Sequence, residues 1–421
     1  CRCRLSPPLS CNSIRSAMVK ATTELRANWV AHDSIQTAVG RYSMIRKMMD
    51  ARMNTAFVET PPIGDSYGEG DMDAFFSFLN EAKSSGFVVF AWISNHKRTY
   101  PVPADLRLED ERKAQAQWVE DIIKGAPCID GIAIDYIRYP TWEVSDGEKI
   151  EGVSLTIQAI RKVTDQRSVS LLSTSFPAAT VTYRGVDSSW DGDVPAWFQD
   201  WYAANPQNYF KVEASSGGTG MVNQGNLNGS NPAFLLGPSF MSYQQDPISW
   251  IENGFVDHVV PMQYTADPAV MRNDIDVWES FTGWIGHNMT SIYLGLGWMD
   301  EPSSFPDSQF DPAAMVAHVK YGQTKGVGGY TIFRLGIPGV DDRPLIDALT
   351  TPNAENEWAP PFITATASPF SSVDLICGME IAEEIPATNG QSSVGKISSD
   401  SSTVLTFSLT VAFLLRGILL R

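Results

Sequence analysis

Residues 130–140, DGIAIDYIRYP, gather polar side chains that can do chemistry directly after an apolar run. Asp135 closes this run, and Tyr136, Arg138 and Tyr139 follow it, so a carboxylate, a guanidinium and two phenols lie close together in the chain. A lone aspartate in such a place is usually a helix cap or a turn former. The concentration of titratable and hydrogen-bonding groups instead favours a catalytic carboxylate at Asp135, with the other three side chains binding a substrate.

The elements that must position this segment are short apolar runs rich in β-branched residues, which alternate with amphipathic stretches between about residues 24 and 349. This alternation is typical of repeated βα units and a parallel sheet. The candidate strands are residues 25–32, 54–60, 87–94, 129–137, 168–176, 256–264, 291–299 and 328–335. Eight such strands predict an α/β fold, a closed (β/α)8 TIM barrel rather than an open doubly wound sheet, with an extended loop at 183–242 after strand five.

The fourth of these strands determines where Asp135 points. Successive strand side chains point to opposite faces, so the small residues Gly131 and Ala133 share a face with Asp135, and two isoleucines share the other. Small residues suit the crowded interior of a barrel, which predicts that Asp135 enters the mouth at the C-terminal end of the strand. Asp130 lies at the opposite end and on the other face, so we expect a structural role for it.

Three segments resemble a known group of proteins. DGIAIDYIRYP resembles the segment that closes strand four in the glycosyl-hydrolase-like TIM-barrel families, which are bacterial proteins predicted to hydrolyse glycosides. LRANWVAH (25–32) resembles their opening strand, and WIENGFVDHVVPMQYT (250–265) resembles their strand six. The resemblance covers most of residues 25–335, although the 183–242 insertion departs from it. It implies a carbohydrate-active barrel that hydrolyses O-glycosidic bonds in a poly- or oligosaccharide.

Such hydrolysis usually needs two carboxyl groups, one protonated to assist the leaving oxygen and one ionised to attack or to activate water. The candidates for the second group are Glu59 after strand two, Asp33 after strand one, and Asp300 and Glu301 after strand seven. We prefer Asp300 and Glu301, because they follow Trp298, whose ring is a candidate platform for a sugar. The alternative is that both acids begin a solvated loop.

Other polar residues at strand ends are candidates for substrate binding. Gln263 and Tyr264 end strand six, and a regular strand allows only one of them to face inward. Asn95 and His96 follow strand three, and Arg334, near the end of strand eight, is a candidate for orienting a carboxylate. Ordinary loop hydrogen bonding is the competing interpretation for each of them.

Composition restricts the class of partner. Hydrophobic residues make up 43% of the chain, with 20 Phe, 12 Trp and 13 Tyr, which supplies a core and an aromatic cleft. The formal net charge of −17, with scattered Lys and Arg, argues against a nucleic-acid partner. No cysteine or histidine pattern has metal-ligand spacing, so we expect neither a metal nor a cofactor. Cys128 precedes strand four and is expected to be a buried thiol.

The ends of the chain differ from its middle. We expect residues 1–22 to be a disordered leader, 23–350 the barrel, 351–402 a Pro/Ser/Thr-rich linker and 403–421 an apolar tail in a disordered C-terminal region. The tail resembles a GPI-attachment signal, with Gly390 or Ser392 as candidate sites, and a tail anchor or an unimportant extension are the alternatives. With sequons at Asn228 and Asn288, this predicts an extracellular or cell-surface glycoprotein attached to a membrane through the tail.

Two other functions remain open. A carbohydrate-binding barrel without catalysis would keep the aromatic cleft but lack a well-placed second acid. A phosphate-handling barrel enzyme is suggested only by the glycine-rich segment at strand eight, GVGGYTIFR, and no strand end presents a Schiff-base lysine.

Overall fold

The structure of the protein is a computed structural model. This structure describes residues 24–61, 69–94, 105–137, 146–167, 169–175, 195–204, 245–264, 267–298 and 311–351. The strands are β1 (Leu25–Val30), β2 (Thr55–Glu59), β3 (Val88–Ser94), β4 (Gly131–Asp135), β5 (Ser170–Ser175), β6 (His258–Pro261), β7 (Tyr293–Gly297) and β8 (Gly329–Phe333).

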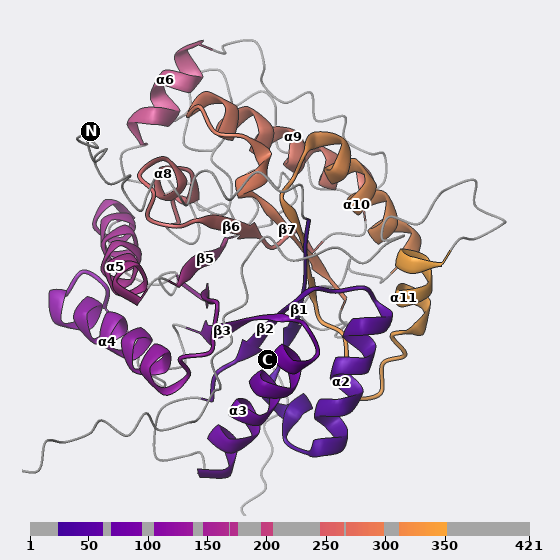
Figure 1. The fold of residues 1–421 in the computed structure, drawn as a ribbon. Coiled ribbons are helices and arrows are strands. Elements are labelled where there is room, and N and C mark those ends of the chain that lie inside the picture. Colours follow the sequence, from indigo (N-terminus) through magenta and orange to yellow (C-terminus); the bar gives the residue numbers. More distant parts are fainter. Residues whose placement is uncertain are drawn as a thin grey trace, which may run out of the picture. The chain divides into compact units, whose positions relative to one another are not determined.

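These strands form one eight-stranded parallel sheet in the order β6-β5-β4-β3-β2-β1-β8-β7. The first and last strands of the chain pair with each other, with Leu25 opposite Gly329. Two isolated parallel bridges, Val259 to Ile292 and Met262 to Gly295, join β6 to β7 and bring the two sheet edges together. The predicted (β/α)8 barrel is therefore confirmed, and Figure 1 shows the helices arranged around the strands.

Helices follow the strands as the βα pattern requires. They are η1 (His32–Ile35), α2 (Ala38–Asp50), α3 (Glu69–Ser84), α4 (Glu109–Gly125), α5 (Asp146–Arg167), α6 (Ala196–Ala204), α8 (Pro247–Glu252), α9 (Pro268–Trp284), η5 (Met289–Ser291), α10 (Pro312–Lys325) and α11 (Arg343–Thr350). Three of them begin with an Asp-Pro pair. Asp246, Asp267 and Asp311 each accept a backbone N–H with the side chain, and proline fits the first helical position because it has no N–H to leave unbonded.

The buried side chains form two apolar clusters, one on each face of the sheet. The interior cluster fills the barrel; it contains Leu25, Ala27, Trp29, Ala31, Phe57, Val88, Phe90, Trp92, Ala133, Leu172, Val260 and Tyr293. The outer cluster lies between the strands and the helices and takes the alternate strand residues, for example Val30, Val58, Ile132 and Ile134. This alternation gives a direct test of which strand side chains face the mouth.

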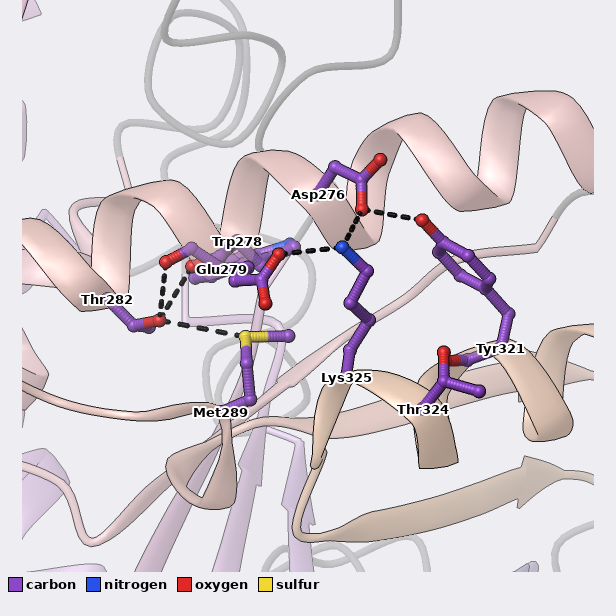
Figure 2. Close-up of polar contacts among 8 residues, drawn as sticks. All are labelled: Asp276, Trp278, Glu279, Thr282, Met289, Tyr321, Thr324 and Lys325. Atoms are coloured by element: carbon purple, nitrogen blue, oxygen red, sulfur yellow. Dashed lines mark hydrogen bonds and ion pairs between the residues drawn. The ribbon is translucent and has the colours of Figure 1, made fainter.

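Polar contacts join α9 to α10 outside the barrel (Figure 2). The Lys325 ammonium lies 2.8 Å from a carboxylate oxygen of Asp276 and 2.7 Å from one of Glu279. The Tyr321 hydroxyl donates to the same Asp276 carboxylate at 2.7 Å. These two carboxylates raise the pKa of Lys325 above its usual value, so the ammonium stays charged and holds the two helices together.

The bonding state of Cys128 differs from the one expected from the sequence. Its side chain is fully buried in the outer cluster, but it is disulfide-bonded, so the prediction of a free thiol is wrong. The predicted leader, linker and tail lie outside the described residues, as does most of the extended loop, including Asn228. Asn288 is exposed and caps η5. Within the described ranges, none of the helices has the length and hydropathy needed to cross a bilayer.

Candidate active site

Asp135 is the last residue of β4 and faces the interior of the barrel. Ala133, two residues earlier, belongs to the interior cluster, whereas Ile132 and Ile134 belong to the outer cluster. The predicted alternation along this strand is therefore confirmed. The Asp135 side chain is nevertheless only 6% exposed, so its carboxyl group lies below the surface of the mouth.

Both neighbouring strands donate hydrogen bonds to this carboxyl group. The Trp92 indole Nε1 on β3 donates to Oδ2 at 3.2 Å, and the Thr174 hydroxyl on β5 donates to Oδ1 at 2.8 Å. A third donor, the backbone N–H of Tyr136, reaches Oδ1 at 2.8 Å. Three donors from three directions fix the orientation of the carboxyl group.

Tyr136 has an unusual backbone conformation. Its φ is 54°, in the left-handed region that a residue with a bulky side chain rarely adopts. Backbone strain of this kind costs on the order of 1–3 kcal/mol and is concentrated at functional sites. The turn directs the Tyr136 N–H toward Asp135 and leaves the phenol ring 40% exposed, where a ligand can contact it.

Tyr264, after β6, lies in the mouth beside Asp135. Its ring stacks on Phe333 with centroids 6.0 Å apart, and a Cβ added to Gly297 would lie 3.1 Å from the same ring. Burial, together with the negative charge of Asp135, raises the pKa of the Tyr264 phenol well above its usual value. The hydroxyl therefore keeps its proton at neutral pH and can donate it in a hydrogen bond.

Gln263 was the other candidate at this strand end. Its side chain is only 1% exposed, and within the described part of the chain the amide has no hydrogen-bond partner. Sequence reasoning allowed one of the two residues to face inward. The contacts with Phe333 and Gly297 identify Tyr264 as the one that lines the mouth.

Aromatic rings pack beneath Asp135, and sequence reasoning missed them. Trp29 meets Phe57 and Trp92 edge to face at 4.8 and 5.1 Å, and Trp92 meets Phe333 at 5.8 Å. The Trp29 indole donates to the Thr331 hydroxyl at 3.0 Å, which fixes the ring. The alternation in the first and third strands carried the signal, because Trp29 and Trp92 occupy inward positions. These rings exclude water from the floor of the mouth.

Glu59 ends β2 and is a candidate for the second acid that faces the interior of the barrel. Phe57, two residues earlier, is in the interior cluster, so Glu59 also faces inward. Its carboxylate accepts the backbone N–H of His32 at 3.1 Å. Glu59 is paired in register with Trp92, whose neighbour in register is Ala133. At the spacing of neighbouring strands, β2 and β4 are therefore about 10 Å apart.

Asp33 and Arg334 form an ion pair at the rim, with Nη1 and Oδ1 3.1 Å apart. Burial alone would raise the pKa of Asp33, but the hydrogen bond and charge of Arg334 outweigh it and lower the pKa overall. An acid held ionised in this way is poorly suited to donate a proton. Arg334 therefore has a carboxylate partner within the chain, and its role in substrate binding stays a prediction.

Trp298 requires a correction. Its ring belongs to the outer cluster, is 5% exposed, and donates through Nε1 to Asp342 at 3.0 Å. The physical reason is alternation: Gly295 and Gly297 take the inward positions of β7, so Trp298 points toward the helices. The expectation that this ring stacks on a sugar in the mouth is therefore wrong.

The remaining expected residues fall into two groups. Asp130 accepts from the Lys83 ammonium at 3.3 Å and from the backbone N–H of Val89 at 2.9 Å, which is the structural role expected of it. The other candidates lie outside the described residues and stay predictions: Asn95, His96, Arg138, Tyr139, Asp300 and Glu301. Among the residues that the structure describes, no cluster of three His, Cys, Asp or Glu side chains could hold a metal ion.

Comparison with known proteins adds little to this geometry. No family model and no curated protein sequence matches the chain. Solved structures that resemble it include the endo-1,4-β-D-mannanase of Thermotoga petrophila, with 10% identity, a TM-score of 0.48 and coverage of 76% of this chain and 90% of the mannanase. The Group IV chitinase of Ostrinia furnacalis has 12% identity, a TM-score of 0.46 and coverage of 77% and 98%. Likenesses this distant do not bear on the substrate.

Proposed function

We propose that this barrel hydrolyses O-glycosidic bonds of a poly- or oligosaccharide bound in its mouth, with Asp135 as one of two catalytic carboxyl groups. The observation that carries the proposal is the setting of Asp135. It faces inward, accepts hydrogen bonds from Trp92, Thr174 and the Tyr136 backbone, and lies above an aromatic floor. The resemblance of residues 130–140 to the strand-four segment of glycosyl-hydrolase-like barrels supports the same reaction class.

The contacts of Asp135, Tyr264 and Tyr136 suggest a separate role for each of them in hydrolysis. Asp135, with three donors, is suited to act while ionised, as a nucleophile, as a base toward water, or as a charge that stabilises an oxocarbenium-like transition state. Tyr264, which keeps its proton, is suited to donate a hydrogen bond to a sugar oxygen beside it. Tyr136 offers an exposed ring on which a sugar can stack.

In most glycoside hydrolases the proton donor to the leaving oxygen is a second carboxyl group. Glu59 is the candidate on the described inner face, and Asp300 and Glu301 are the candidates outside the described residues. Glu59 and Asp135 lie on strands separated by one strand, β3, and the distance between their carboxyl groups would distinguish an inverting from a retaining mechanism. Separate Glu59→Gln, Asp300→Asn and Glu301→Gln variants distinguish these candidates.

The test is a screen of polysaccharides and chromogenic glycosides with the wild type and Asp135→Asn in parallel. We expect the wild type to hydrolyse at least one substrate, and Asp135→Asn to lose at least 100-fold in kcat/KM while it still folds, since removing a nucleophile or base removes the main chemical step. Asp121→Asn, on the exposed face of α4, is the matched control and should keep full activity. Circular dichroism and thermal unfolding establish that each variant is folded.

Two results would refute the proposal. If Asp135→Asn retains wild-type hydrolysis, the carboxylate is not catalytic. If the wild type binds a glycan, measured by calorimetry, but cleaves none, the barrel is the non-catalytic carbohydrate-binding protein that the sequence left open.

We also propose that the protein acts outside the cytosol, at the cell surface. The disulfide of Cys128 supports this, because structural disulfides persist in oxidising compartments and are rare in the cytosol. Membrane attachment through the apolar tail at 403–421 remains part of the proposal. Release of the protein from intact cells by a phosphatidylinositol-specific phospholipase would distinguish a GPI anchor from a tail that spans the membrane.

A further inference from the structure

Cys128 is disulfide-bonded, and its partner must be one of the other four cysteines of the chain. These are Cys1, Cys3, Cys11 and Cys377, and all of them lie outside residues 24–351. Whichever is the partner, the bond fixes a terminal segment to the barrel. Cys128 precedes β4, so the attachment point lies at the N-terminal end of the strands, opposite the mouth.

The surroundings of Cys128 discriminate among these partners. The Cys128 side chain is fully buried in the outer apolar cluster, next to the buried residues Ala126 and Ile129. A disulfide brings the two Cα atoms within about 4.4–6.8 Å, so the residues beside the partner must enter the same apolar surroundings. A partner with charged neighbours would have to bury those charges at considerable cost.

Flanking residues favour one cysteine. Cys1 and Cys3 lie in CRCR, next to arginines, and Cys11 lies between serine and asparagine. Cys377 lies in DLICGM, with leucine and isoleucine immediately before it. We propose that Cys377 is the partner of Cys128, so that the chain after α11 is fastened across the N-terminal end of the barrel.

Chain length and composition agree with this pairing. The segment between Thr351 and Cys377 can extend to at most about 90 Å, and a domain of this size measures on the order of 40–50 Å across. It contains Trp358, Phe362, Ile363 and Phe370, apolar side chains that gain by packing on a surface. Residues 352–377 would then belong to the folded domain, and the linker would begin later than composition suggested.

Formation of the bond removes two electrons and two protons from the two thiols. The electrons pass to the disulfide of a thiol oxidoreductase, the class of oxidant present in secretory compartments.

Peptide mapping tests the pairing directly. The full chain, secreted from a eukaryotic host, is alkylated without reduction, digested with trypsin and analysed by mass spectrometry. Cys128 falls in peptide 125–138, whereas Cys1, Cys3 and Cys11 fall in three separate peptides, 1–2, 3–4 and 5–15. We expect peptide 125–138 to be linked to the peptide that contains Cys377. A link to any of the three N-terminal peptides, or an alkylated Cys128, overturns the proposal.

Stability gives an independent test. Cys128→Ser and Cys377→Ser should each lower Tm by roughly 5–10 °C, and the double variant should lose no more than either single one, because both remove the same bond. Cys11→Ser is the matched control and should leave Tm unchanged. Additive losses in the double variant, or an unchanged Tm in Cys377→Ser, contradict the pairing. Neither readout depends on hydrolysis, so the result is independent of the proposed function.

Discussion

The buried carboxyl group of Asp274 should make the stability of this barrel depend on pH. It lies on the buried face of α9 with an exposed fraction of 0%, and neither carboxyl oxygen has a hydrogen-bond partner among the described residues. Burial without a partner raises the pKa of Asp274 from 3.8 to about 8. At neutral pH the folded protein therefore carries a proton on this group that the unfolded chain has lost.

The size of the effect follows from linkage. Between pH 4 and pH 8 the folded state binds the extra proton, so the free energy of unfolding falls as pH rises, by about 1.4 kcal/mol per pH unit from this group. The contribution is fully present below about pH 4 and is lost as pH rises through the folded pKa of about 8. From pH 5 to pH 7 the loss amounts to about 3 kcal/mol, which is a large part of the stability of an ordinary domain.

Asp274→Asn removes the proton uptake and keeps the shape of the side chain. Urea unfolding of the wild type and the variant at pH 5, 6 and 7 gives the stability difference at each pH, in which the titration of all other groups cancels. We expect the free energy of unfolding of the variant, relative to that of the wild type, to rise by about 3 kcal/mol between pH 5 and pH 7. Asp121→Asn, an exposed change of the same kind on α4, should show no comparable gain. A difference between Asp274→Asn and the wild type that stays constant with pH would refute the reasoning.

Two further predictions concern single contacts. Thr174→Val removes the 2.8 Å hydrogen bond to Asp135 and should lower kcat about 10- to 100-fold with a smaller change in KM. Thr174→Ser keeps the hydroxyl donor and should retain most of the activity. Equal losses of activity in both variants would contradict a role for the hydroxyl. Lys325→Met removes the ammonium between Asp276 and Glu279 and should cost about 1 kcal/mol by urea unfolding at low salt, and less in 1 M salt. Lys113→Met, which breaks an exposed pair within α4, should cost less, and a salt-independent loss at Lys325 would contradict the ionic explanation.

The fold could be predicted because strands and helices alternate visibly along the chain, and each strand carries its own pattern of inward and outward residues. The inward position of Asp135 follows from the small residues Gly131 and Ala133 in β4. The same rule, applied to β7, would have placed Trp298 among the helices, because Gly295 and Gly297 take the inward positions. That mistake came from giving an aromatic residue beside two acids more weight than the periodicity of its strand.

The partners of Asp135 could not be predicted in the same way. Trp92 and Thr174 are separated from Asp135 by whole βα units, and whether their side chains meet the carboxylate depends on the register between β3, β4 and β5. Register is a property of the assembled sheet and is not encoded in any one strand. The left-handed turn at Tyr136 is equally hard to foresee, because tyrosine has no preference for that conformation.

Asp135 and Asp274 show why burial alone does not mark a functional acid. Both side chains are removed from water, but Asp274, on the buried face of α9, has no hydrogen-bond partner among the residues described, and the proton that it retains removes its charge. Asp135 lies at a strand end, where two neighbouring strands and a strained backbone turn supply hydrogen-bond donors to its carboxyl group. The proposed catalytic role of Asp135 therefore rests on the number and direction of its hydrogen-bond donors, and not on its depth of burial.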